Sequence, residues 1–218
     1  MNKRKNIITV AIDSPAAAGA GTQAKFIAKE YNLLYLDTGK IYRLIGKIKL
    51  TAGKKFNHSF IKKKISKIKI SQLNNTKLIS DDIAKCASIV AKDNNIRKLV
   101  KKFQLNCAYN PPKKYSGSVL DGRDITSVIM KDAMFKFYIT ANLKIRAKRR
   151  YKEFKKLKKK ISYKEVLKSL RKRDYLDKNR KHSPLKKTQD SILINTSKLS
   201  KKACFIKIKK IIDNEINT

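Results

Sequence analysis

A run of small residues connects an apolar segment to a segment with helical spacing. It consists of Ser14, Pro15, Ala16, Ala17, Ala18, Gly19, Ala20, Gly21 and Thr22. Small residues in such a turn let backbone N–H groups approach phosphate oxygens, and the dipole of the following helix favours anions. The common phosphate-binding loop has a Gly, four further residues and then Gly-Lys-Ser/Thr. Ser14 stands here at the first Gly and Ala20 at the Lys, so an ordinary strand–helix turn remains an alternative.

Acidic residues end three of the apolar segments, namely Asp13, Asp37 and Asp121. Phosphoryl transfer needs a divalent cation that neutralises the phosphates, and Mg²⁺ takes one or two carboxylates together with water and phosphate oxygens. Asp121 is the expected acidic partner of such a metal, mostly through water, and the Thr22 hydroxyl is the expected loop ligand. These two residues are the candidate metal site.

Arginine is the rare basic residue in this chain, with 10 Arg against 45 Lys. Its planar, permanently charged fork makes bidentate contacts to phosphate that Lys cannot reproduce. Eight of the ten arginines lie in or beside short polar motifs: Arg43, Arg97, Arg123, Arg146, Arg149, Arg150, Arg173 and Arg180. This distribution favours anion-binding roles over solvated surface charges.

The elements that must position these residues alternate in kind along the chain. Apolar runs of strand length occupy residues 6–13, 33–37, 118–121, 135–140 and 191–195. Helical spacing of apolar residues predicts helices over 22–31, 38–50, 81–103 with a break near 93–95, 142–160, 162–172 and 200–216. Such alternation predicts an α/β fold, a five-stranded parallel sheet flanked by helices. Ligands bind such sheets at the carboxyl ends of the strands, where the acidic residues lie.

Three local features complete the expected organisation. Residues 51–80 are the least regular, and the alternation over 65–70 resembles an exposed strand. Residues 110–118 (NPPKKYSGS) predict a loop. Thr38 is a candidate N-cap for the helix that follows the second strand.

Composition limits the class of protein. The 218 residues carry a formal net charge of +39, which fits either nucleic-acid binding or a lysine-coated globular surface. The lysines are spread over the whole chain without interleaved aromatic residues, so no specific nucleic-acid partner is expected. No apolar stretch is long enough to span a membrane, and Asp13 ends the first apolar run too early for an export signal. The three cysteines are an odd number and lack the spacing of metal ligands, which agrees with a cytoplasmic protein. The protein is expected to be monomeric.

The order of the motifs resembles that of bacterial cytidylate kinases, in the nucleoside monophosphate kinase superfamily of P-loop kinases. The matching segments cover nearly the whole chain: residues 12–15 (IDSP), 37–43 (DTGKIYR), 119–124 (VLDGRD), 146–150 (RAKRR), 173–180 (RDYLDKNR) and 190–197. The resemblance implies a core domain of residues 1–50 and 86–218, a short inserted nucleotide-binding lobe at 51–85 and a helical lid at 150–172. The implied reaction moves the γ-phosphoryl group of ATP to CMP or dCMP with Mg²⁺.

The resemblance also implies roles for individual residues. The residues implied to bind the acceptor phosphate are Arg43, Arg123 and Arg180. Those implied to contact the cytosine are Ser88, Arg97 and Asp124. Arg173 and Asp177 are implied to lie near the ribose, and Thr38 is also on the substrate side. Arg146 and Arg150, one helical turn apart, look like lid arginines that close on the donor phosphates. Arg149 is expected to point elsewhere. The adenine would be bordered by Asn195, Thr196 and Ser197.

The missing loop lysine leaves open which residue, if any, replaces it and whether the chain is an active kinase. Lys40 follows the second strand at the same sheet edge and is the expected catalytic replacement, whereas Lys25 would have to reach back along its helix. Lys40 also fits the general lysine bias of the chain. The alternatives at the level of function are a nucleotide-binding protein that has lost catalysis with Ala20, or a basic nucleic-acid-binding protein on a kinase scaffold.

Overall fold

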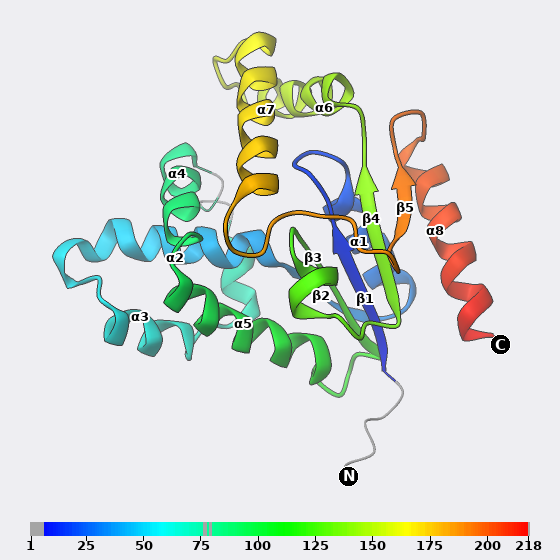
Figure 1. Cartoon of the computed structure of the whole chain (residues 1–218), viewed down its shortest axis with the longest axis horizontal. Coiled ribbons are helices and arrows are strands. Elements are labelled where there is room, and N and C mark those ends of the chain that lie inside the picture. The colour runs from blue at the N-terminus through cyan, green and yellow to red at the C-terminus, as the bar shows by residue number, and fades with distance from the viewer. Residues whose placement is uncertain (1–6, 76–77, 79, 218) are drawn as a thin grey trace.

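The sheet is parallel throughout, as expected. The computed structural model describes residues 7–75, 78 and 80–217. In chain order, the strands of its sheet are β1 (Ile8–Asp13), β2 (Leu33–Asp37), β3 (Gly117–Gly122), β4 (Phe135–Thr140) and β5 (Ile192–Asn195). Their spatial order is β2-β3-β1-β4-β5, so β1 lies at the centre (Figure 1). The register pairs Asp37 with Asp121 and Asp13 with Gly122, which brings three strand ends level with one another.

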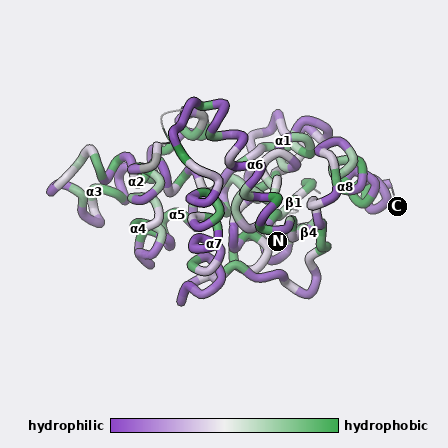
Figure 2. The backbone as a smooth tube through the Cα atoms, turned by 90° about the horizontal axis from the view of Figure 1, so that it is seen from above, coloured by the Kyte–Doolittle hydropathy of each residue, from purple (hydrophilic) through white to green (hydrophobic). Residues whose placement is uncertain are grey.

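Helices cover both faces of the sheet and extend beyond it. Those that the structure describes are α1 (Ala20–Glu30), α2 (Thr38–Ala52), α3 (His58–Ile65), α4 (Asp81–Val90), α5 (Asn94–Tyr109), α6 (Leu143–Lys156), α7 (Tyr163–Asn179) and α8 (Lys201–Ile216). Shorter turns are the 3₁₀ segments η1 (Gly53–Lys55) and η2 (Ile70–Asn74) and the π-helical turn η4 (Ile125–Ile129). Figure 1 shows α6 and α7 above the carboxyl ends of the strands. Seen from above, α3 and α4 lie on one side of α7, and β1, β4 and α8 lie on the other (Figure 2).

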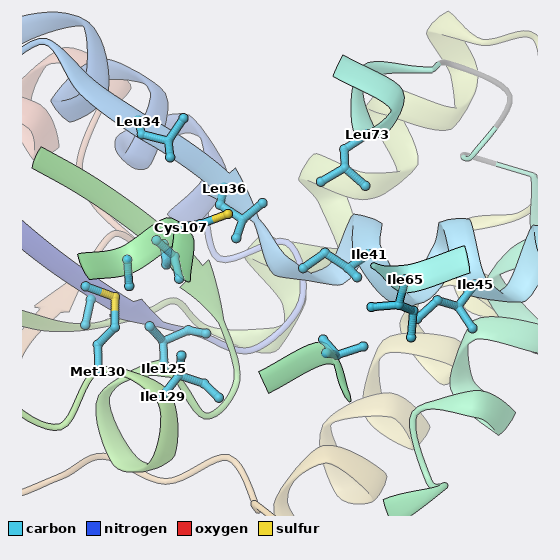
Figure 3. Packing of buried hydrophobic residues seen from close by; sticks show 14 of the residues in the cluster. Leu34, Leu36, Ile41, Ile45, Ile65, Leu73, Cys107, Ile125, Ile129 and Met130 are labelled. Carbon is cyan, nitrogen blue, oxygen red and sulfur yellow. The ribbon is translucent and has the colours of Figure 1, made fainter. Parts of the chain in front are cut away.

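Two apolar clusters hold these layers together. One joins β2 and β3 to α2, α5 and η4, and Figure 3 shows Leu36, Ile41 and Ile45 within it. The other packs β1 and β4 against α1 and α8, with Phe137 and Ile208 fully buried. Burying both faces explains why the strands read as continuous apolar runs rather than alternating ones. The loop after β1 is thereby fixed above a rigid core.

The strand expected over residues 65–70 is wrong. Ile61 and Ile65 share one face of helix α3 and are buried, and the chain then turns towards η2. Ile68 and Ile70 pack partly against the same apolar cluster. The alternation over 65–70 therefore comes from the end of a helix and the turn after it, because the tertiary contacts override the local period of two.

The N-cap expected at Thr38 is also wrong. Asp37 caps α2, since its carboxylate accepts a hydrogen bond from the backbone N–H of Lys40. The Thr38 hydroxyl instead donates to the backbone carbonyl of Asp121, 2.8 Å away, and so ties the start of α2 to the end of β3. This contact brings the substrate-side motif of residues 37–43 next to the third strand end.

Several helices differ in length from the expected ones. The break near 93–95 is confirmed, because Asp93 caps a new helix, α5, by accepting from the N–H groups of Asn95 and Ile96. Helix α6 ends at Lys156 rather than 160, and α7 continues past 172 to Asn179. As a result Arg173 and Asp177 lie on α7 itself.

The expected lobe, 51–85, holds α3 and the short turns, and its status as a separate domain stays a prediction. Within the described ranges, none of the helices combines the length and apolarity needed to cross a bilayer.

Candidate active site

The loop after β1 leaves the start of α1 open to an anion. Gly19 is the N-cap of α1, with φ of 101°, and no side chain caps the helix. The first backbone N–H groups of α1 therefore lack the side-chain acceptor that usually satisfies a helix start. Ala17 also has a positive φ of 61°, which a side chain rarely adopts. A helix start with these features suits a phosphate group.

Arg149 holds this loop in place, contrary to the expectation that it points elsewhere. Its guanidinium donates to the Thr196 hydroxyl at 2.9 Å, to the Thr196 carbonyl at 2.6 Å and to the Ala18 carbonyl at 3.4 Å. The Thr196 hydroxyl itself donates to the Ala18 carbonyl. Residues 146, 149 and 150 share one face of α6 at spacings of three and four, a signal that could have predicted this contact.

Arg146 lies inside the protein rather than free above the loop. It is 5% exposed, and its guanidinium donates to the carbonyls of Ala141 and Ala16 and pairs with Asp174, 2.5 Å away. Because all three of its nitrogens are engaged, Arg146 joins α6, α7 and the loop. The expected contact of Arg146 with donor phosphates stays a prediction, and Asp174 is a partner that the sequence did not reveal.

Asp121 lies against the start of α1. A Cβ placed on Gly21 would lie 3.4 Å from Asp121 Oδ2 and 3.3 Å from the Tyr35 hydroxyl. Burial raises the pKa of Asp121 above its usual range, and repulsion from Asp37 adds to the rise. The opposing influences come from Arg123, from a hydrogen bond with Tyr35 and from the charge of Lys40. A further cation beside Asp121 would lower its pKa and stabilise the ionised carboxylate.

A divalent cation fits this position. Asp121 Oδ1 is buried without a hydrogen-bond partner among the described residues. Such an acceptor-only oxygen, beside a second carboxylate, suits a hard cation that keeps several waters and phosphate oxygens. Thr22, on the first turn of α1, is half-buried, and its backbone N–H donates to Gly19.

Asp13, the third acidic strand end, has a structural role. It is fully buried and accepts hydrogen bonds from the N–H groups of Ile125 and Thr126 and from the Thr126 hydroxyl. Burial raises the pKa of Asp13 to about 6, against the lowering effect of these three donors. Asp13 therefore anchors η4. Its position at a strand end alone could not show whether its role was structural or catalytic.

The guanidinium of Arg173, on α7, feels the charge of three other arginines. Crowding by protein atoms and repulsion from Arg123, Arg43 and Arg150 lower the pKa of Arg173 to about 10, against the attraction of Asp177. Half of the Arg173 side chain is exposed, where an anion can reach it. Arg123 pairs with Asp177 at 2.8 Å. Guanidinium groups that repel one another in this way favour the binding of an anion.

The neighbours of Arg123 and Arg150 show where this arginine cluster lies. Arg123 follows Gly122, whose carbonyl accepts from the N–H of Ser14 at the start of the loop. Arg150 is on α6 next to the loop contact of Arg149, pairs with Glu153 and stacks over Phe154. The arginine cluster (Arg43, Arg123, Arg150 and Arg173) therefore adjoins the phosphate-binding loop. Arg43 also donates to the Leu78 carbonyl.

A second polar group lies further along β3. Asp124 pairs with Arg97 at 2.5 Å and lies 3.7 Å from Arg180, whose Nε donates to the Ser183 carbonyl. Burial raises the pKa of Tyr42 to about 12, and the charges of Arg97, Asp124 and Arg180 all act on it. The expected pairing of Arg97 with Asp124 is confirmed as a contact, and Tyr42 is a neighbour that the sequence did not single out.

The remaining expected residues lie at the margins of this region. Ser88 is exposed on α4, and its hydroxyl donates to the Ala84 carbonyl of its own helix. Asn195 ends β5 and accepts from the N–H of Ser197. Lys40 is half-buried at the start of α2, whereas Lys25 is exposed on α1. The roles proposed for Ser88 and Asn195 stay predictions.

The chain is similar to known proteins over nearly its whole length. The family model described as cytidylate kinase matches residues 10–214. A cytidylate kinase of Clostridium botulinum (strain Loch Maree) is 38% identical over 215 residues, covering 95% of this chain and 99% of the relative. One of Clostridium tetani is 39% identical over 224 residues, covering 96% and 95%, and one of Bartonella bacilliformis is 38% identical over 209 residues, covering 95% of each.

One solved structure supports the fold alone. An uncharacterized protein from Eubacterium ventriosum aligns with a TM-score of 0.57 at 18% identity and covers 94% of this chain and 98% of its own. The family model spans nearly the whole sequence, and the relatives match it end to end at well above a third identity. The chain therefore belongs to the cytidylate kinase family.

Proposed function

We propose that this chain transfers the γ-phosphoryl group of ATP to CMP or dCMP with the help of Mg²⁺, giving ADP and CDP or dCDP. The observation that carries the proposal is the arginine cluster beside an open helix start at the phosphate-binding loop. Two anionic groups must meet for this reaction, and their mutual repulsion is the main obstacle to it. A cationic cluster on one side and a helix N-terminus on the other reduce that repulsion.

The acceptor phosphate is assigned to Arg43, Arg123 and Arg180. In the absence of substrate these side chains use carboxylates or carbonyl groups as partners, such as Asp177 for Arg123. An arriving phosphate offers each fork two acceptor oxygens and a full charge, which is a stronger partner than a carbonyl. Arg173 and Asp177, on the adjacent face of α7, are assigned to the ribose.

The cytosine is assigned to Arg97 and Asp124, with Ser88 at the margin. A guanidinium and a carboxylate side by side can donate to the cytosine O2 and N3 and accept from its exocyclic amino group. Asp124 is 8% exposed and keeps Arg97 as a partner, so an acceptor that lacks the amino group would forgo one further hydrogen bond to this carboxylate. This arrangement supports cytidylate over uridylate.

The donor side uses the loop of residues 14–22 and the lid. Backbone N–H groups of the loop and of the α1 start are assigned to the ATP phosphates, and Arg150 is assigned to the charge that develops during transfer. Arg146 and Arg149 position the loop through Ala16 and Ala18. Asn195 and Thr196 border the expected adenine position. Thr38 supports the acceptor side by linking α2 to β3.

Asp121 and Thr22 are the residues that would hold Mg²⁺, with Thr22 one residue past Gly21, which stands at the Ser/Thr position of the loop pattern. When bound, the ion would neutralise phosphate charge on the donor. Asp121 has an unpartnered buried oxygen for a metal-bound water, and Asp37 adds negative charge beside it. These two carboxylates hold their place through the Tyr35 hydroxyl and the cap of α2.

The test is an acceptor panel. ADP release from ATP is measured with CMP, dCMP, UMP and AMP in turn, each with and without Mg²⁺. We expect turnover with CMP or dCMP at least tenfold above that with UMP and AMP, and loss of turnover when Mg²⁺ is removed with a chelator. Equal rates with all four acceptors would contradict the cytosine assignment. Nucleotide binding without turnover would favour a protein that has lost catalysis.

A further inference from the structure

We propose that Lys40, at the start of α2, supplies the cation between the donor β- and γ-phosphates that position 20 of the loop lacks. The inference rests on the proposed kinase function and concerns the residue that completes it. The loop lysine of P-loop enzymes reaches these two phosphates from the residue after the second loop glycine. In this chain that residue is Ala20, which is buried with 4% exposure and has no charge to offer.

Lys40 starts from the same sheet edge as the loop. Helix α2 begins directly after β2, whose last residue, Asp37, is level with Asp121 at the end of β3. Strand β3 in turn pairs with β1, from which the loop emerges. Neighbouring strands lie about 5 Å apart, so two strand spacings, or roughly 10 Å, separate the backbone origins. A four-carbon ammonium stem can cover much of that distance.

Contacts at these strand ends show that the loop and the start of α2 both approach Asp121. Gly21 on the loop side lies against Asp121, because a Cβ there would come within 3.4 Å of its Oδ2. On the other side, the Thr38 hydroxyl donates to the backbone carbonyl of Asp121, 2.8 Å away, and Asp37, level with Asp121, accepts from the backbone N–H of Lys40. Asp121 is therefore next to both the start of α1 and the start of α2, the helix that carries Lys40.

The ammonium of Lys40 is also uncommitted. Its backbone N–H donates to Asp37, but across the described ranges its side chain makes no hydrogen bond and no ion pair. A half-buried lysine beside acidic residues, with no fixed partner, is free to take an arriving phosphate. Lys25 differs in both respects that matter, because it is exposed and lies on α1, which leads away from the loop.

One other role would use the same position. Lys40 could serve only to offset the charges of Asp37 and Asp121, which are themselves next to the expected metal. The two roles differ in what can replace the residue. A lysine placed at position 20 restores a cation to the phosphates but not to the Asp37 side of Asp121. Rescue from position 20 therefore separates them.

The experiment compares parent protein, Lys40→Ala, Lys40→Gln, Lys25→Ala and the double variant Ala20→Lys/Lys40→Ala in the CMP-dependent ADP-release assay. We expect both Lys40 variants to lose about 100- to 1000-fold in kcat, as for removal of one stabilising group at a transition-state charge. Their KM for CMP should stay within about threefold of the parent value. Lys25→Ala should stay within about twofold in kcat, and the double variant should recover at least tenfold over Lys40→Ala.

Two further measurements make the result decisive. Thermal unfolding of each variant shows that the fold is kept, and Ala20→Lys alone shows that the buried position accepts a lysine. Titration calorimetry without CMP should show Lys40→Ala losing affinity for ATP but not for AMP. A kcat within about threefold of parent in the Lys40 variants overturns the inference, as does a loss of kcat with unchanged ATP affinity. A parent protein without CMP-dependent turnover contradicts the proposed function instead.

Discussion

Replacing Asp124 by Asn tests how the cytosine is read. The change keeps the volume of the side chain and removes its charge. Asp124 is close to fully buried, pairs with Arg97 at 2.5 Å and lies 3.7 Å from Arg180. The Asn amide keeps one acceptor oxygen but turns a donor towards either a guanidinium or the cytosine amino group, where only an acceptor is useful.

The expected size follows from the hydrogen bond that is lost. A hydrogen bond to a charged group contributes about 1.5–3 kcal/mol. At about 1.4 kcal/mol per factor of ten, kcat/KM for CMP should fall roughly 10- to 150-fold. The same loss should reduce the free energy of unfolding by about 1–3 kcal/mol, because Arg97 keeps its charge in a site that is little exposed. For a protein of this size, each kcal/mol lowers Tm by roughly 2–4 °C.

Steady-state kinetics with each substrate varied in turn measure the effect. Asp132→Asn is the matched control, since Asp132 is an exposed carboxylate in the segment after η4. We expect the ATP KM to change less than about threefold in either variant, and the CMP effect to appear in Asp124→Asn alone. Equal effects on CMP and ATP in Asp124→Asn would refute the assignment of Asp124 to the acceptor base.

Three further predictions concern the lid, the loop and the anchor beneath it. Arg150→Lys should lower kcat about 10- to 100-fold with CMP KM nearly unchanged, because a fork contact made mainly in the transition state is lost; collapse of CMP binding with kcat preserved would place Arg150 on the acceptor side. Ala17→Gly should raise Tm by about 1–4 °C, since relief of a positive φ at 61° is worth about 1–2 kcal/mol and the added backbone freedom of Gly offsets about 0.5–1 kcal/mol; a lower Tm would speak against strain there. For Asp13, the pKa in the folded protein is about 6 against an ordinary value of 3.8, so the unfolded state ionises first as pH rises. The stability of the parent relative to Asp13→Asn should therefore fall by about 2 kcal/mol between pH 4 and pH 7, and urea unfolding that shows a constant difference would contradict this.

The sheet and the place of the site could be predicted from the sequence because both depend on short-range patterns. Strands buried on both faces appear as apolar runs, and β2 and β4 begin and end where those runs do. The small residues after β1 predicted the phosphate-binding loop, and the acidic strand ends predicted the edge of the sheet where the site lies. The individual roles of residues such as Arg43 and Asp177 came from resemblance to a family.

The errors share one cause, which is that a side chain's partner depends on tertiary packing. Residues 65–70 alternate like a strand, yet Ile65 ends helix α3, which packs against α5, and is buried in the apolar cluster. Arg149 and Arg150 are adjacent in sequence, but one holds the loop through Ala18 and the other joins the arginine cluster. Asp13 and Asp121 end neighbouring strands, but only Asp13 meets three donors from η4. No local pattern distinguishes these pairs.

The most direct test follows the phosphoryl group itself. The parent protein is incubated with CMP, Mg²⁺ and ATP labelled in its γ-phosphoryl group, and the products are separated. The structure predicts that the label moves stoichiometrically into the β-phosphoryl group of CDP, even though Ala20 replaces the loop lysine. Label that stays in ATP despite nucleotide binding, or that appears as inorganic phosphate without CDP, would contradict an active cytidylate kinase.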